Sequence, residues 1–283
     1  MRILLTNDDG VLSPVLHRSA AALALEHEVV VAAPAADQSG KSHSFTHGEG
    51  RLLTYSRDGS TPWPQYRVEG TPSDCVKVAV SHLLKTNPPD LVISGPNLGE
   101  NAGVSAVYSG TVAAAREGAL WGIPALAVSL SETTDTHLEF ALEWLRALLQ
   151  AGAADPELLP VAGTLWNINF PACAPGSVAG ARFAPMSTVM FRDHYVEAAT
   201  EHQLPGYQLR GHKPSGDFVA GTDDELQARG FITVAPLQIT QADQVALKRL
   251  KPLEERLDGL FDEARARLAT GPNAPFPISD FVP

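Results

Sequence analysis

Two adjacent carboxylates, Asp8 and Asp9, follow the first apolar run of the chain. Two like charges this close resist joint ionisation, so the pair requires a compensating partner if both groups are charged. A divalent cation is such a partner, and an all-oxygen set of ligands suits magnesium, manganese or calcium better than zinc. Asp-Asp-Gly can also form a simple turn, so the metal interpretation depends on further ligands elsewhere in the chain.

Two more oxygen-bearing side chains stand in comparable positions. Ser39 follows the apolar run 28–33 after a short loop, and Asn97 lies beyond the run 90–94. In a parallel sheet the carboxyl ends of the strands share one edge, and ligands bind in the crevice outside that edge. We therefore expect one divalent metal ion per subunit there, with the two aspartates also taking part in catalysis. The expected ligands are Asp8, Asp9, Ser39 and Asn97.

A second group of residues suits a phosphate. The small-residue turn 109–111 opens an alanine-rich segment that extends to Trp121. A helix beginning there presents free N–H groups and the positive end of its dipole, and the hydroxyl groups of the turn can cap it or donate to an anion. The preceding stretch 95–103 is rich in glycine and asparagine, so its backbone can approach a ligand closely. The expected phosphate- and substrate-binding residues are Asn101, Ser109, Gly110 and Thr111.

His43 is a candidate proton donor, because it lies near Ser39 in the sequence and histidine titrates in the pH range useful for catalysis. Three aromatic residues are large enough to stack on a base, although packing roles are more common for such side chains. They are Trp63, Tyr66 and Trp121.

Short apolar runs alternate with helix-period segments, which is typical of βαβ units and a parallel sheet. The runs contain Ile, Leu, Val and Ala without polar alternation, so they are expected to be strands with both faces covered. Strands are expected at residues 2–7, 28–33, 90–94, 124–130 and 164–170. Helices are expected to begin at Ser13-Pro14 and at Thr71-Pro72, the second with a capping box, and to cover residues 109–121 and 136–150.

The regular pattern breaks down in the last third of the chain. Two short β-rich pieces, 181–187 and 230–235, flank a polar stretch containing several glycines, which indicates a projecting hairpin or arm. The tail 253–268 has helical spacing of its apolar residues. The expected divisions are an α/β core at 1–173, a β-rich arm that mediates oligomerisation at 174–252, and a terminal helix and tail at 253–283.

Composition narrows the class of protein. The chain has 283 residues, a formal net charge of −11 and two cysteines. The negative charge argues against binding a nucleic-acid duplex, and two cysteines provide neither a disulfide framework nor a thiolate metal cluster. No apolar run approaches the length of a membrane helix, and the N-terminal run is too short for a signal peptide, so a cytoplasmic location is expected.

A series of motifs resembles the survival protein E family in content and order. They are ILLTNDDG at 3–10, QSG at 38–40, HSFT at 43–46, GTPSDCV at 70–76, SGPN at 94–97, YSGTV at 108–112 and NINFP at 167–171. Pro96 departs from the aliphatic residue usual in the family, and the usual aromatic and glycine pattern of the arm is poorly kept around 207–217. The resemblance implies a three-layer α/β/α sandwich with a mainly parallel, Rossmann-like sheet, and it implies the same four metal ligands.

The resemblance also implies an activity and an assembly. The expected reaction is metal-dependent hydrolysis of nucleoside 5′- and 3′-monophosphates to nucleoside and phosphate, with short polyphosphate as a further candidate substrate. Homodimers or homotetramers are expected, often with exchanged C-terminal segments. Two alternatives stay open: a haloacid-dehalogenase-like phosphatase in which Asp8 forms an aspartyl-phosphate, and a nonenzymatic metal- and phosphate-binding switch. The first usually requires two acids separated by one residue, whereas the acids here are adjacent.

Overall fold

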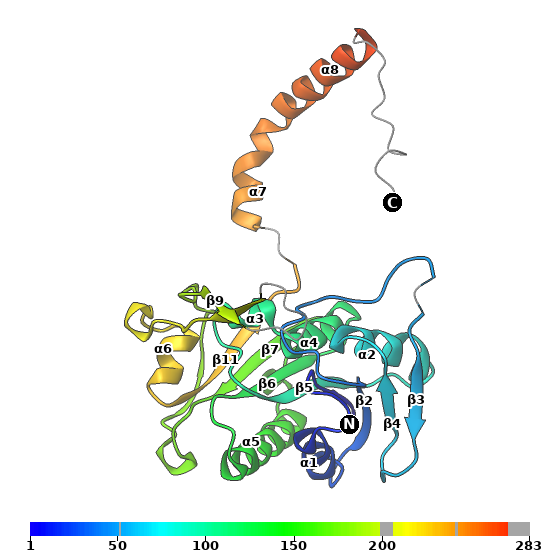
Figure 1. Ribbon diagram of the computed structural model, residues 1–283, viewed down its shortest axis with the longest axis vertical. Coiled ribbons are helices and arrows are strands. Elements are labelled where there is room, and N and C mark those ends of the chain that lie inside the picture. The colour runs from blue at the N-terminus through cyan, green and yellow to red at the C-terminus, as the bar shows by residue number, and fades with distance from the viewer. Residues whose placement is uncertain (51, 199–205, 241–242, 271–283) are drawn as a thin grey trace. The chain divides into compact units, whose positions relative to one another are not determined.

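Nine strands among the described residues form one sheet, in the order β3-β4-β2-β1-β5-β6-β7-β11-β8. The computed structural model describes residues 1–283 except 51, 199–205, 241–242 and 271–283 (Figure 1). The strands are β1 (Arg2–Thr6), β2 (Glu28–Pro34), β3 (Tyr55–Asp58), β4 (Gln65–Val68), β5 (Leu91–Leu98), β6 (Ala125–Leu130), β7 (Leu165–Phe170), β8 (Gly180–Phe183) and β11 (Phe231–Leu237). Strands β4, β2, β1, β5, β6 and β7 run parallel, while β3 is antiparallel to β4 and β11 is antiparallel to β7.

Helices cover both faces of this sheet (Figure 1). They are α1 (Pro14–Leu23), α2 (Pro72–Val78), which continues into a π-helical turn at Ala79–Leu83, α3 (Ser105–Tyr108), α4 (Gly110–Leu120), α5 (Asp135–Ala154) and α6 (Asp223–Ala228). One hydrophobic core lies between the sheet and helices α1 and α5, and a second lies between the sheet and helices α2 and α4. The predicted three-layer α/β/α sandwich with a mainly parallel sheet is confirmed.

The continuous apolar runs follow from this layering. Along β1, Ile3 and Leu5 belong to the core beneath α1 and α5, whereas Leu4 between them belongs to the core beneath α2 and α4. All three side chains are fully buried. A strand whose two faces are both covered has no solvent-facing positions for polar residues, so the sequence shows no alternation.

The predicted capping motif is present at the start of α2, but only part of the predicted start of α1 is present. Thr71 Oγ1 accepts a hydrogen bond from the Asp74 N–H (3.2 Å), and an Asp74 carboxylate oxygen accepts one from the Thr71 N–H (3.0 Å), which is the predicted capping box. Ser13 does stand at the N-cap of α1 before Pro14, but its side chain makes no capping hydrogen bond to a described residue.

Several elements differ from the expectations. The β-rich pieces predicted to flank a hairpin are strands β8 and β11, which pair with each other and extend the main sheet. Asn97 lies inside β5, which continues beyond Ser94 through a shift of register against β6. The sequence did not predict β3 and β4, because β3 is largely exposed and polar and lacks an apolar run.

The segment between β8 and β11, residues 184–230, is called the insert below. It contains a separate two-stranded antiparallel hairpin of β9 (His194–Ala198) and β10 (Gly206–Arg210), followed by helix α6. The hairpin agrees with the projecting element expected in this region.

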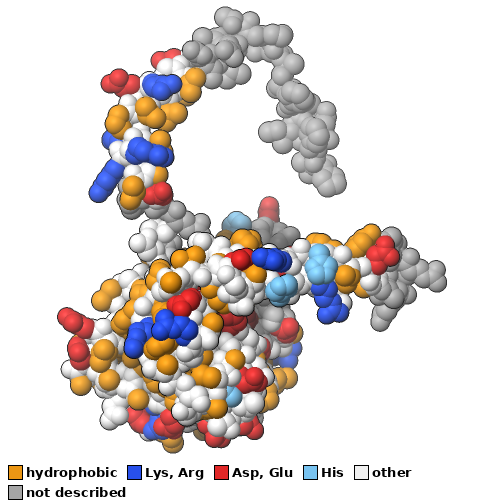
Figure 2. All heavy atoms as spheres, turned by 90° about the vertical axis from the view of Figure 1, so that its left-hand side faces the viewer, with side chains coloured by type: hydrophobic (Ala, Val, Ile, Leu, Met, Phe, Trp, Pro, Cys, Tyr) orange, Lys and Arg blue, Asp and Glu red, His pale blue; other side chains and the backbone are white. Residues whose placement is uncertain are grey.

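The chain divides into two compact units, Met1–Ile239 and Thr240–Pro283. The second unit contains α7 (Gln244–Leu250) and α8 (Glu254–Thr270), and the predicted terminal helix corresponds to α8. Figure 2 shows hydrophobic side chains interspersed with Lys and Arg along this helical segment. Among the described helices of either unit, none is both long and apolar enough to cross a membrane.

Candidate functional site

The two adjacent carboxylates lie in a tight turn directly after the central strand β1. Asn7 holds this turn closed, because its Nδ2 donates to Gly10 O (3.0 Å) and its Oδ1 accepts from Gly10 N (3.2 Å). Gly10 has a φ of 102°, which favours glycine, and the Gln38 N–H donates to Asp8 O (2.8 Å). The turn is therefore fixed on both sides and joined to the loop that carries Ser39.

The N-terminus of α4 packs directly on Asp8. Thr111 Oγ1 donates to Asp8 Oδ1 (2.7 Å), and the Thr111 N–H donates to Asp8 Oδ2 (3.2 Å). A side chain at Gly110 would lie 3.0 Å from Asp8 Cβ, so glycine permits this approach. Thr111 is fully buried and its hydroxyl is bonded to Asp8, while the phosphate contact expected of it from the sequence stays a prediction.

Burial affects both carboxylates, and they differ in their partners. Desolvation raises the pKa of Asp8, opposed by its hydrogen bonds from Thr111. Desolvation, followed by repulsion from Asp8 and Asp37, raises the pKa of Asp9 to about 6. Asp9 Oδ2 is buried with no hydrogen-bond partner among the described residues. A buried carboxylate oxygen without a hydrogen-bond donor is costly when it is charged, and a bound cation would compensate that charge.

Ser39 lies in the loop after β2, two residues beyond a third carboxylate that the sequence did not single out. Ser39 Oγ donates to Asp37 Oδ1 (2.6 Å), and this bond together with the Ser39 N–H lowers the pKa of Asp37. The loop is attached to α3, because Ser42 N donates to Tyr108 O (3.0 Å) and Ser42 Oγ to Val107 O (2.8 Å). On β5, Asn97 Nδ2 donates to Gly99 O (2.8 Å), which leaves its carbonyl oxygen as the atom suited to a cation.

These elements line an open pocket of about 290 Å³, called the cavity below. It is lined by Asp8, Ser39, Gly40, Asn97, Leu98, Asn101, Ser105, Tyr108, Ser109 and Phe191. Five of the predicted site residues are therefore brought together: Asp8, Ser39, Asn97, Asn101 and Ser109. Within the described structure, Asp9, Gly110 and Thr111 adjoin this cavity through their contacts or chain connection to Asp8, without forming its wall.

Asn101 is held by a buried polar network from neighbouring strands. Its N–H donates to Asn169 Oδ1 (2.8 Å), its Nδ2 donates to Ser129 Oγ (2.8 Å), and its carbonyl accepts from Asn167 Nδ2 (2.7 Å). The supporting residues were missed from the sequence as site residues. The available signal was their polarity inside apolar strands, since a buried polar side chain needs a specific partner.

His43 does not line the cavity formed by the described residues. Its Nε2 lies 2.8 Å from Glu117 Oε2, and Glu117 Oε1 also accepts from Lys77 Nζ (2.6 Å) and Trp121 Nε1 (2.8 Å). Burial tends to raise the pKa of Glu117, but these three partners outweigh it and lower that pKa to about 2. The cluster anchors the Ser39 loop to α4.

The aromatic residues at the cavity differ from those considered in the sequence. Trp63 packs on the core near α1, and Trp121 is bonded to Glu117. Tyr108 and Phe191 line the cavity instead. Tyr108 directly precedes the Ser109 turn, which was a usable signal, whereas Phe191 lies far away in the sequence and carried none.

Comparisons with known proteins agree with this geometry. The sequence profile of the family described as "Survival protein SurE" matches residues 3–193. A protein of Thermus thermophilus, "5′-nucleotidase SurE 1", is 40% identical over 263 residues, covering 92% of this chain and 99% of the relative. A "5′-nucleotidase SurE" of Nitrosococcus oceani is 37% identical over 257 residues, covering 91% and 99%. The crystal structure of the SurE protein from Aquifex aeolicus superposes with a TM-score of 0.74 at 29% identity, covering 90% of this chain and 100% of that one.

Proposed function

The chain belongs to the survival protein SurE family, and on this premise we propose that it is a 5′-nucleotidase, which hydrolyses nucleoside monophosphates to nucleoside and phosphate. The observation that carries the proposal is the meeting of Asp8, Ser39 and Asn97 in one cavity with the N-terminus of α4. These residues come from the carboxyl ends of three adjacent strands, where ligands bind in open parallel sheets.

The residues present fit a hard divalent cation. The donor set of two carboxylates, a hydroxyl and an amide oxygen is that of a magnesium, manganese or calcium site. The buried, unpartnered Asp9 Oδ2 supports this assignment, because an uncompensated carboxylate oxygen is costly in this environment. We propose that Asp8, Asp9, Ser39 and Asn97 hold the ion. When bound, such an ion polarises a phosphoryl oxygen and lowers the pKa of a bound water.

The protein groups around these ligands have separate tasks. Thr111 donates to Asp8 through both its hydroxyl and its N–H, so we assign it the positioning of that carboxylate. Ser109 and Asn101 line the cavity and are the proposed contacts of the substrate phosphate. The positive end of the α4 dipole favours negative charge at this point, so the local field compensates for the net charge of −11. The proton-donor role predicted for His43 stays a prediction, since its Nε2 is bonded to Glu117.

The test is phosphate release from a panel of nucleoside 5′- and 3′-monophosphates and short polyphosphate, with magnesium, manganese, calcium or EDTA. Hydrolysis of the nucleotides with a divalent metal, and its loss in EDTA, is the expected result. An aspartyl-phosphate trapped by acid quench during turnover would favour the haloacid-dehalogenase-like alternative. No release from any compound with any metal would favour the nonenzymatic switch.

A further inference from the structure

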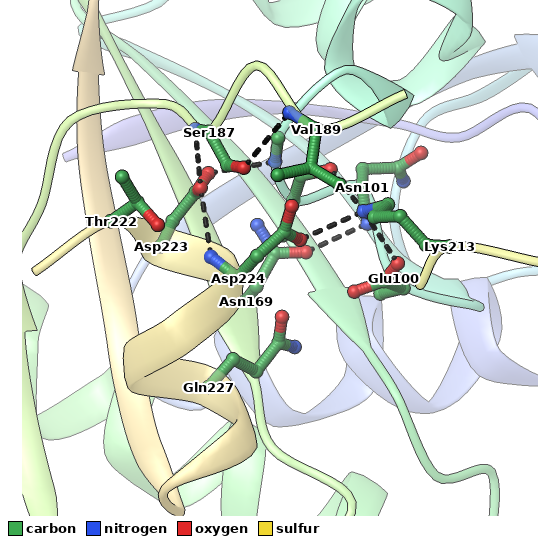
Figure 3. Close-up of polar contacts among 12 residues, drawn as sticks. Glu100, Asn101, Asn169, Ser187, Val189, Lys213, Thr222, Asp223, Asp224 and Gln227 are labelled. Atoms are coloured by element: carbon green, nitrogen blue, oxygen red, sulfur yellow. Dashed lines mark hydrogen bonds and ion pairs between the residues drawn. The ribbon is translucent and has the colours of Figure 1, made fainter. Parts of the chain in front are cut away.

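The insert connects two strands at the edge of the sheet, β8 and β11, and it contributes one residue to the wall of the candidate site. Phe191, which lies between β8 and the hairpin, lines the same cavity as Asp8 and Asn101. A side chain on an insert can form a defined part of a site only if the insert is fixed to the core. Two buried acidic residues of α6 and one lysine provide this attachment (Figure 3).

Asp223 joins the start of the insert to Gly103, two residues beyond the cavity-lining Asn101. One carboxylate oxygen accepts from the Gly103 N–H (2.8 Å), and the other accepts from the Ser187 N–H (2.7 Å). The Asp223 N–H in turn donates to Pro185 O (3.1 Å). Asp223 is fully buried, so water cannot reach its carboxylate, and loss of any of these hydrogen bonds would leave a buried polar group without a partner. The chain leading to Phe191 is therefore fixed in relation to the 100–103 segment.

Lys213 makes the second attachment. Its Nζ donates to Asp224 Oδ1 (2.8 Å) on α6, and to Glu100 Oε1 (2.9 Å) and Ala102 O (2.9 Å), which flank Asn101 in the chain. Its side chain is only 6% exposed, and Figure 3 shows it between Glu100 and Asp224. Burial tends to lower the pKa of Lys213, but the bonds to the two carboxylates raise it, so the ammonium group stays charged.

The same ammonium group contacts the aromatic wall. Lys213 Nζ lies 5.4 Å from the centre of the Phe191 ring, within the range of a cation–π contact. Lys213 thus bonds the segment that contains Asn101 and touches the ring that faces the cavity.

We propose that Phe191 is a specificity-determining residue that contacts the nucleoside part of the substrate, and that Lys213 positions it. This inference rests on the proposed nucleotidase function. Asp8, Ser109 and Asn101 provide polar groups for the phosphate, whereas Phe191 and Tyr108 provide aromatic surface in the same cavity. A nucleoside base has a π-face on which an aromatic ring stacks without regard to base identity. Phe191 thus favours nucleotides over phosphomonoesters that lack an aromatic base.

The test uses the full-length protein with manganese and 5′-AMP, and compares Phe191→Leu with Phe191→Tyr. Loss of one stacking contact raises the KM for 5′-AMP about 5- to 150-fold in the leucine variant, with kcat changed by less than about 3-fold. The tyrosine variant restores the wild-type KM. Inhibition by inorganic phosphate should keep its wild-type constant in both variants, because phosphate has no base to stack on the ring.

The attachment is tested separately with Glu100→Ala, which removes one of the two bonds from Lys213 to the 100–102 segment and leaves its bonds to Ala102 O and Asp224. We expect a rise in KM for 5′-AMP, again with unchanged inhibition by phosphate. Asp217→Asn is the matched control, because Asp217 forms an exposed ion pair with Arg192 on the insert that does not reach the cavity. Its kinetics should equal those of the wild type.

Two results would overturn the inference. One is a wild-type KM in Phe191→Leu, and the other is a parallel loss of 5′-AMP and phosphate affinity, which indicates general disruption. If the wild-type protein hydrolyses no nucleotide, the proposed function fails, and calorimetric titration with adenosine still tests the aromatic wall. Binding by the wild-type protein that is lost in Phe191→Leu and kept in Phe191→Tyr supports the wall, whereas equal binding by all three, or by none, contradicts it.

Discussion

At the scale of single residues, the two adjacent aspartates have different surroundings. Asp8 is held by two hydrogen bonds from Thr111, whereas Asp9 has a buried oxygen without a partner among the described residues. The first carboxylate is held in position, and the second lacks a compensating partner among the described residues. Replacement of each should therefore affect activity in the same way and metal-free stability in different ways.

Asp8→Asn and Asp9→Asn are each expected to lower kcat/KM for nucleotides about 100-fold or more, because a charged ligand of the ion is lost. Without metal, Asp9→Asn should be more stable than the wild type by about 1 kcal/mol, since like-charge repulsion is relieved. Asp8→Asn gains less, because it also disturbs the bonds with Thr111. Thermal melts with manganese and with EDTA measure both effects. Wild-type activity together with an unchanged manganese-dependent rise in Tm would mean that the pair is only a turn.

Glu117 provides a prediction for pH dependence. Its pKa is about 2 in the folded protein against an ordinary value of 4.5, so between these values the unfolded chain binds more protons. The stability that Glu117 contributes is therefore complete above about pH 5 and is lost as the pH falls toward 2. The shift corresponds to about 3 kcal/mol at most.

Glu117→Gln should consequently be less stable than the wild type at pH 7, and the difference should narrow between pH 5 and pH 2. Urea unfolding at a series of pH values measures this difference. Glu143→Gln is a control, because Glu143 pairs with Arg146 at an exposed position. A difference for Glu117→Gln that stays constant from pH 7 to pH 3 would contradict the assignment.

At the scale of elements, the hairpin β9–β10 has little core of its own. Tyr195, Tyr207 and Leu209 are 69%, 63% and 52% exposed. A two-stranded hairpin is marginally stable alone in water, so these side chains are expected to be covered by a second copy of the chain. Lys213 and Asp223 lie outside the hairpin, so the expected role of the hairpin in self-association can be tested separately from the positioning of Phe191.

Replacement of residues 194–210 by a short Gly-Ser linker should weaken self-association and leave the manganese-dependent rise in Tm unchanged. Light scattering at micromolar concentration measures the assembly. Removal of 188–229 is a contrasting variant, because it also deletes Asp223 and Lys213 and should disturb the cavity. An unchanged oligomer after loss of the hairpin alone would exclude this element from the interface.

At the scale of the whole molecule, the second unit presents apolar side chains along α8. Leu257, Leu260 and Phe261 are 63%, 60% and 66% exposed, and their spacing puts them on one face of the helix. Such a face is stable in water when another surface covers it. Together with the exposed hairpin, this face is consistent with the homodimer or homotetramer expected from the sequence, which stays a prediction.

A double variant, Leu257→Lys with Phe261→Lys, should raise the dissociation constant of self-association about tenfold or more, because two large apolar side chains of the expected interface are replaced by charged ones. Asp258→Lys, a charge change on the same helix, is the control. Analytical ultracentrifugation over a range of concentrations measures the constants. Equal constants for the wild type and the double variant would exclude this face of α8 from the interface.

The sequence by itself determined the layers of the fold and the family. Strands such as β1 are apolar on both faces, and the capping box at Thr71 marks the start of α2, so these local signals are written in adjacent residues. The motifs at the ends of β1, β2 and β5 also placed the predicted ligands together, because parallel strands share one edge. The strand and helix ends were less well defined, as the extension of β5 through Asn97 illustrates.

The tertiary structure alone decided what each polar group near the site contacts. The bond from Thr111 to Asp8 joins residues 103 positions apart, and the bond from Lys213 to Glu100 joins residues 113 positions apart. Neither bond can be recognised from the sequence, because hydrophobic periodicity and turn-forming residues carry information only about residues that are close together in the chain. The pairing of β8 with β11 is likewise non-local, and it brings both ends of the insert to one edge of the sheet. Phe191 could therefore be located at the cavity only after the packing of the insert was known, since the energy that fixes it comes from buried contacts between distant segments.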